Sequence, residues 1–262
     1  MKLKEAFAIT ERCCAPVALS DELCAKYNHY DNSGILVENE GEITGVLFSL
    51  DFTPAAAEEA IKRGYNLIIT HHPAIYHGQH RITPSNDLIS QALVKCIRGG
   101  VGVISMHLNF DCAREGIDYY LMKGLGGTEA EIMDKLSVGG YGRVYSIPEI
   151  KFCDFVRKIG KTFNTKRIFS YGDPQRPIKK VASFCGAGAD ENAGGFAIAN
   201  GADVIVSSDF AHHMITGLYY NGVNVVQMTH YASEVYGFTH MARRLIPELG
   251  VPAYVLIDEE LL

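Results

Sequence analysis

Long apolar runs are missing from this chain of 262 residues. No window approaches the roughly 18 uncharged apolar residues of a membrane-spanning helix, and the first residues, 1–5, lack the apolar stretch of a signal peptide. Positive charge is also scarce, with 24 basic against 30 acidic residues and a net charge of -6. General nucleic-acid binding is therefore not expected, although a small basic pocket could still hold a nucleotide. We expect a cytoplasmic protein that does not bind membranes.

Paired-cysteine motifs are missing as well. The seven cysteines are an odd number, Cys13 and Cys14 are neighbours, and none belongs to a CxxC pair. Neither a thiolate zinc site nor a disulfide framework is therefore expected, and the thiols should be reduced. The remaining composition, with 47% hydrophobic and 21% charged residues, is ordinary for a globular protein. This length allows one large core or two modest ones.

The first half of the sequence alternates between apolar runs of strand length and helical patterns. One helix is well delimited, because Thr53 can cap its N-terminus, Pro54 suits its first position and Gly64 suits its end. The strands expected in this half lie at residues 35–37, 45–50, 66–70 and 102–106, and the helices at 2–13, 20–27, 54–63 and 85–98.

The second half repeats this plan. Each half ends in a histidine followed four residues later by a carboxylate: His107 with Asp111, and His230 with Glu234. Alternating strands and helices favour α/β lobes with parallel strand pairing. The strands expected in the second half lie at residues 180–184, 203–207 and 224–228, and the helices at 149–163 and 191–199.

This internal repeat predicts an α/β fold of two similar lobes related by a pseudo-two-fold axis. We place the first lobe at residues 1–125 and the second at 126–262, with the C-terminal segment able to pack back on the first lobe. Functional groups of parallel α/β sheets gather at the carboxyl ends of the strands. Because the polar clusters of both halves follow such strand ends, we expect a metal site in the cleft between the lobes.

Two adjacent histidines, His71 and His72, close an apolar strand of the first half. In an extended backbone their side chains point in opposite directions, so they could reach two neighbouring ions more easily than chelate one. Pro73 restricts His72 to extended geometry. Neutral imidazole suits zinc, iron, nickel and related ions. The alternative is a pair of hydrogen-bonded polar residues in a loop.

Asp111 and Glu234 strengthen the metal interpretation. A carboxylate at the start of a helix lies near the positive end of the helix dipole and stays ionised, so it could bridge two cations. His230 could share an ion with Glu234 on one helix face or across a tight turn. Simple helix capping would explain Asp111 alone. It explains poorly why both halves of the chain carry a carboxylate four residues after a histidine.

Further polar residues could line the same site. His107 is expected to carry protons or support a ligand, while Asp209, His212 and His213 could contact substrate or transfer protons, or form an exposed polar loop. The loop with His77 and His80 could cover the substrate or be merely solvated. The run Gly186-Ala187-Gly188 is a weak phosphate signal, because it lacks both the Rossmann spacing and the lysine of a P-loop.

In this order and spacing the motifs resemble the Nif-three-like family, which is catalogued as GTP cyclohydrolase I type 2 homologues. The resemblance covers nearly the whole chain and rests on residues 30–34, 71–73, 107–111, 201–213 and 230–234. The chain departs from the family pattern in having Tyr30 where Trp is common, in Thr70 and in Ser207-Ser208, and it is too short for the inserted central domain of longer relatives.

The resemblance implies two α/β lobes, a dinuclear metal site and a ring-shaped hexamer of stacked trimers. It also implies that Glu234 bridges the two ions, and that the ligands are His71, His72, Asp111, His230 and Glu234. This sequence has the family's ligand residue at each of these five positions. The ligand types permit zinc, iron, manganese or nickel.

Two functions remain open on this evidence. The first is a metal-dependent hydrolase that acts on a small nucleotide-like or heterocyclic substrate, since paired ions can activate water for attack. The second is a non-catalytic protein that binds or assembles a metal or metallocofactor, because no catalytic base is fixed by the sequence.

Overall fold

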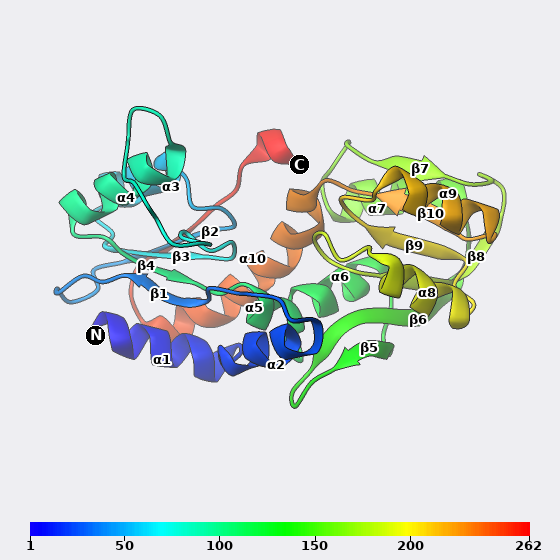
Figure 1. Cartoon of the computed structure of the whole chain (residues 1–262), viewed down its shortest axis with the longest axis horizontal. Helices are drawn as coiled ribbons and strands as arrows, with labels where there is room; N and C mark the ends of the chain where they lie inside the picture. Colours follow the sequence, from blue (N-terminus) through cyan, green and yellow to red (C-terminus); the bar gives the residue numbers. More distant parts are fainter. The chain divides into compact units, whose positions relative to one another are not determined.

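Two separate sheets hold the strands of this chain (Figure 1). The structure is a computed structural model that describes every residue from 1 to 262. It divides into a first unit, Met1–Ala113 with Phe238–Ile257, and a second unit, Arg114–Gly237 with Asp258–Leu262. The expected division at 125/126 differs from this one, because helix α6 (Ile117–Leu125) packs on strands of the second unit.

The sheet of the first unit has the strand order β1-β4-β3-β2-β11. Its three central strands, β2, β3 and β4, are fully buried, and all neighbours pair in parallel except β1 with β4. The last strand of the chain, β11, joins this sheet by pairing in parallel with β2, which lies about 200 residues earlier in the sequence. The strands are β1 (Gly34–Val37), β2 (Val46–Ser49), β3 (Leu67–Thr70), β4 (Gly102–Ser105) and β11 (Ala253–Leu256).

Helices α3 and α4 cover one face of this sheet, and α1 and the C-terminal part of α10 lie across the other (Figure 1). As the sequence predicts, the Thr53 side chain accepts a hydrogen bond from the Ala56 N–H at 3.1 Å, and Gly64 ends α3 with φ +73°. The helices are α1 (Leu3–Cys13), α2 (Ala18–Tyr27), α3 (Pro54–Arg63), α4 (Leu88–Gly99), α5 (Leu108–Cys112) and α10 (His230–Leu249).

The sheet of the second unit has the order β5-β6-β8-β9-β10-β7. The three strands β8, β9 and β10 are parallel, and the outer strands pair antiparallel. An apolar core forms between this sheet and helices α8 and α9. The elements are β5 (Glu131–Lys135), β6 (Gly140–Lys151), α7 (Phe152–Thr162), β7 (Phe169–Tyr171), β8 (Pro177–Ser183), α8 (Glu191–Ala199), β9 (Val204–Ser207), α9 (His212–Tyr220), β10 (Asn224–Gln227) and the short 3-10 helix η1 (Glu259–Leu261).

Both units therefore have the predicted α/β fold, with a parallel β-α-β core in each sheet. In each unit the polar residues follow the carboxyl ends of these parallel strands: residues 71–72 follow β3, residue 107 follows β4 and residue 230 follows β10. None of the helices combines the length and the apolar character that crossing a bilayer requires.

Candidate metal centre

Three imidazoles of the first unit converge at the ends of β3 and β4. One ring nitrogen each of His71, His72 and His107 lies within 4.8 Å of the other two. His71 is fully buried, whereas His72 and His107 are partly exposed. Asp111, in α5, places its Oδ1 atom 3.5 Å from the Nε2 atom of His71. The first unit thus gathers three imidazoles and one carboxylate.

The backbone after β3 explains how neighbouring histidines share this site. The N–H groups of His71 and His72 both donate to the carbonyl of Leu50, at 3.2 and 3.0 Å, so the chain bends there. The two ring centroids lie only 4.9 Å apart. The expectation of opposite side-chain directions, which assumed an extended backbone, does not describe this bend.

Each of these rings is fixed through its Nδ1 atom. His71 Nδ1 lies 3.0 Å from the carbonyl oxygen of Met106, His72 Nδ1 lies 2.7 Å from Asp51 Oδ1, and His107 Nδ1 lies 2.8 Å from Asp31 Oδ1. An oxygen acceptor at Nδ1 places the proton there and leaves Nε2 as the ligand atom, an arrangement that is general among metal-binding histidines.

The carboxyl of Asp31 is strongly acidic. Burial alone would raise the pKa of Asp31, but the hydrogen bond and charge of His107, together with bonds from Ser33 and Ser20, lower it to about 2. The ionised carboxylate therefore holds His107 by a charge-assisted contact over a wide pH range.

A smaller group of the same chemistry occurs in the second unit. His230 begins α10 and Glu234 lies one turn later, so they share one helix face, with His230 Nε2 and Glu234 Oε1 3.0 Å apart. The Nδ1 atom of His230 is again held by a carboxylate, Asp209 Oδ2, at 2.5 Å. The sequence left Asp209 either in contact with substrate or in an exposed polar loop; in the structure its carboxylate contacts the His230 ring.

The spacing of these donors fits cation ligands. Two ligands with bonds of about 2.1 Å to one ion lie about 3.0 Å apart at an octahedral angle and about 3.4 Å apart at a tetrahedral one. The imidazole-to-carboxylate separations are 3.0 Å for His230 with Glu234 and 3.5 Å for His71 with Asp111. Each unit therefore holds a donor pair that suits a divalent ion of the imidazole-and-carboxylate class.

Other predicted residues lie apart from these groups. His212 and His213 begin α9 as exposed side chains, and His213 Nε2 is 3.9 Å from Glu191 Oε1. His80 is exposed in the loop before α4. His77 instead stacks on Tyr30, with ring centroids 5.8 Å apart.

Sequence reasoning missed the roles of Asp31 and Asp51. A signal was available for Asp51, because it lies two residues after the end of β2, and β2 is the neighbour of β3, whose end carries His71 and His72. No local pattern marks Asp31, because its histidine partner is 76 residues away in the sequence.

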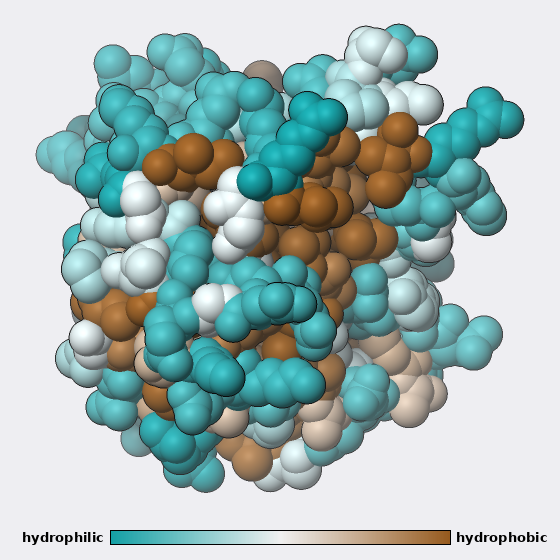
Figure 2. Space-filling view, turned by 90° about the vertical axis from the view of Figure 1, so that its left-hand side faces the viewer, coloured by the Kyte–Doolittle hydropathy of each residue, from teal (hydrophilic) through white to brown (hydrophobic).

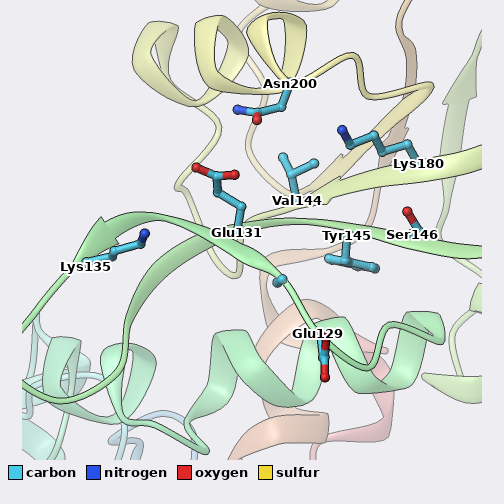
Figure 3. A pocket seen from close by; sticks show the side chains of 9 residues that line it. Glu129, Glu131, Lys135, Val144, Tyr145, Ser146, Lys180 and Asn200 are labelled. Carbon is cyan, nitrogen blue, oxygen red and sulfur yellow. The ribbon is translucent and has the colours of Figure 1, made fainter.

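A surface cavity of about 470 Å³ lies elsewhere on the second unit (Figure 3). Charged side chains of both signs border it, and histidine is absent from its lining. It is therefore distinct from both donor groups. The residues around it are Glu129, Ala130, Glu131, Lys135, Val144, Tyr145, Ser146, Lys180 and Asn200.

Comparison with known proteins agrees with this description. The chain is 31% identical over 239 residues to a GTP cyclohydrolase 1 type 2 homolog of Clostridium perfringens, covering 89% of this chain and 87% of that protein. A protein of the same name from Clostridium acetobutylicum is 26% identical, with 99% and 96% covered. The crystal structure of a Staphylococcus aureus hypothetical protein has the same fold, with a TM-score of 0.86, 23% identity, and 99% and 97% of the two chains covered.

A family model also matches nearly the whole chain. Residues 2–256 match the model of the family described as Duf34/NIF3, NGG1p interacting factor 3. The resemblance inferred from the sequence motifs is thereby confirmed, and the chain belongs to the Duf34/NIF3 family.

Proposed function

We propose that this protein is a dinuclear metal-dependent hydrolase that acts on a small nucleotide-like or heterocyclic substrate. In this proposal the two lobes are related by a pseudo-two-fold axis, and two divalent ions, of zinc, iron, manganese or nickel, lie in the cleft between them. Glu234 would be shared by the two ions, and the other residues that would hold them are His71, His72, Asp111 and His230.

One observation carries the proposal: the imidazoles of the ligand set are all held in the same way. The Nδ1 atoms of His71, His72 and His230 each meet an oxygen, at 3.0, 2.7 and 2.5 Å. Histidines that serve only in packing need no such shared orientation. Outer contacts of this kind fix the ring and raise the basicity of Nε2, and they support metal affinity.

The residues near the ligands suit hydrolytic chemistry. Bound divalent ions would polarise the bond to be cleaved and acidify an attacking water. His107 would accept or return a proton at Nε2, because Asp31 holds its Nδ1 atom at 2.8 Å and so fixes the orientation of the ring. We assign His212 and His213 a secondary part in proton transfer or substrate contact, from their exposed position at the start of α9.

Exposed aromatic rings near His107 support a heterocyclic substrate. Tyr30 is 51% exposed and Tyr76 is 40% exposed, and the Tyr76 hydroxyl donates to the Tyr30 carbonyl at 2.8 Å. The Tyr76 ring centroid lies 6.3 Å from that of His107. Fixed aromatic faces bind planar bases by stacking, so they suit a substrate with a heteroaromatic ring.

Turnover by metal-loaded protein tests the proposal. Protein stripped with a chelator and reloaded with zinc or manganese should release product from at least one compound in a panel of nucleotides and free heterocycles. The stripped protein should lose that activity. Fully loaded protein that turns over nothing in the panel would count against hydrolysis.

A second candidate is a non-catalytic protein that binds or assembles a metal or metallocofactor. The burial of the donors favours it, since His71, Asp111 and Glu234 are almost fully buried and would retain an ion well. A bound small molecule that leaves the protein chemically unchanged, identified by mass spectrometry, would support this candidate over the hydrolase.

We also propose a cytoplasmic homo-oligomer, a hexameric ring. All seven cysteines are free thiols, which suits a reducing compartment. Figure 2 displays a brown, apolar area across one face of the first unit, and exposed apolar side chains of this unit include Ile61, Leu88 and Ile97. Apolar surface of this kind favours association. Light scattering on a sizing column would give the mass of a hexamer, and a monomer mass would exclude it.

A further inference from the structure

A fully buried charge pair lies inside the second unit, away from the donor groups. Asp118, in the first turn of α6, is 0% exposed, and Arg143 of β6 is 2% exposed. The Arg143 guanidinium donates to Asp118 Oδ2, which also accepts from the Gly142 N–H at 3.0 Å. A buried pair of this kind contributes little net stability, because desolvating two charges offsets their attraction. Its position therefore calls for a reason other than stability.

The second oxygen of Asp118 reaches a turn of special geometry. Asp118 Oδ1 accepts from the Cys185 N–H at 3.2 Å. The next residue, Gly186, has φ +57°, a left-handed conformation that favours glycine. The turn is also held from other elements: the Tyr141 hydroxyl donates to the Cys185 carbonyl at 2.5 Å, and the Ser208 hydroxyl donates to the Gly186 carbonyl at 2.5 Å.

This turn rests directly against the donor pair of α10. A methyl group added to Gly186 would lie 2.2 Å from Glu234 Oε1 and 3.3 Å from His230 Nε2. The contact with Glu234 is too short, so the carboxylate or the turn would have to move. The Gly186 N–H also donates to the Ser233 hydroxyl at 3.0 Å, and that hydroxyl donates to the His230 carbonyl at 2.8 Å. A shift of the turn must therefore move the carboxylate, the helix start or both.

We infer that the Asp118–Arg143 pair and Gly186 are positioning residues for the Glu234 carboxylate, and that they set the affinity of this half of the site for a divalent cation. The inference rests on the proposed metal function. Asp118 holds the Cys185 peptide through a hydrogen bond, and this peptide fixes the turn at Gly186. The turn then restricts the position of the Glu234 carboxylate beside His230. The ligand carboxylate is thus kept in place by a charge buried in another part of the unit.

Zinc titration of the stripped full-length protein, against a competing chelator, tests this inference. Gly186→Ala pushes on Glu234 directly while leaving the buried pair intact, and it should weaken zinc binding about 10- to 100-fold. Gly201→Ala is the matched control, because Gly201 has φ +65° in the same unit but nothing within 4 Å of the added methyl group. Both variants carry the same backbone strain, so they should lose similar thermal stability without metal, and only Gly186→Ala should lose affinity.

A double variant tests the buried pair itself. Asp118→Asn with Arg143→Met removes both charges together, so neither is left buried and alone. We expect it to fold, as judged by circular dichroism, and to bind zinc about 10-fold more weakly or worse. A folded double variant that binds zinc as tightly as wild type would overturn the positioning part of the buried pair. If the double variant does not fold, Gly186→Ala still decides the part of the Gly186 turn.

The outcomes separate this inference from the proposed function. Wild-type protein that binds no zinc, manganese, iron or nickel would overturn both. Wild-type protein that binds zinc, with Gly186→Ala binding equally well, would overturn the inference and leave the metal function standing. Equal loss of affinity in Gly186→Ala and Gly201→Ala would also overturn it, because the strain alone would then account for the effect.

Discussion

The Nδ1 atom of His230 lies 2.5 Å from Oδ2 of Asp209. Asp209 holds this contact from a left-handed backbone conformation, with φ +54°. Few residues other than glycine adopt that conformation, and aspartate and asparagine tolerate it better than most. Backbone strain of this kind is found where function demands a particular side-chain position. The carboxylate of Asp209 is thus placed at some conformational cost, and the ring of His230 is what it orients.

Substitution of Asp209 should weaken metal binding in a graded way. Asp209→Gly keeps the backbone conformation but removes the acceptor, so His230 loses its orientation, and zinc affinity should fall about 10- to 100-fold. Asp209→Asn keeps an uncharged acceptor and should lose less. Chelator competition on stripped protein measures both.

A matched control exists in the same unit. Asn164 also has a left-handed backbone, with φ 52°, and it belongs to neither donor group. Asn164→Gly should leave zinc affinity unchanged. If Asp209→Gly behaves like Asn164→Gly, the contact with His230 has no part in metal binding.

Removal of the Tyr76 ring should weaken binding of heterocyclic compounds. Base stacking on one aromatic ring contributes about 1–3 kcal/mol, so Tyr76→Leu should reduce affinity for a purine nucleotide by about 5-fold or more. Tyr220→Leu is the control, because Tyr220 is 84% exposed and lies in the second unit. Titration calorimetry measures nucleotide affinity, and elemental analysis of the same samples shows whether a variant has lost its metal. Lower affinity at unchanged metal content indicates lost stacking. Equal affinities of the two variants would remove the argument for a heteroaromatic substrate.

The contact between Asp31 and His107 predicts a specific pH dependence of stability. The pKa of Asp31 in the folded protein, about 2, is below its usual value of 3.8, so its contribution to stability is complete above about pH 5 and is lost as the pH falls towards 2. We expect wild type to exceed Asp31→Asn by about 2 kcal/mol in unfolding free energy at pH 5. Urea unfolding of stripped protein between pH 6 and pH 2.5 measures the difference. A gap that stays constant across this range would contradict the assignment.

Local signals in the sequence located much of the fold. Thr53, Pro54 and Gly64 delimit α3 as predicted, because capping and helix termination depend on neighbouring residues. The antiparallel strands β5 and β6 were not predicted. The pairing of β5 with β6 depends on contacts between the two strands and has no local sequence signal. Gly140 and Gly142 also interrupt the apolar pattern of β6, and both have a positive φ in the structure.

The site was predictable in its ligand types but not in its supporting contacts. Histidines and carboxylates after strand ends were evident in the sequence. The partners that orient them were not, because His72 and Asp51 are separated by 21 residues, and His107 and Asp31 by 76. Which carboxylate meets which ring depends on strand order and on the bend at His71 and His72, and both are properties of the folded sheet.

Metal content of single ligand variants tests the central claim most directly. Elemental analysis should find two divalent ions per chain in wild type, and loss of metal from His71→Ala and from Glu234→Ala alike, although these residues belong to different units. Thermal melts of the stripped variants would verify that each still folds. Retention of both ions by Glu234→Ala would contradict a shared site in which that carboxylate bridges the metals.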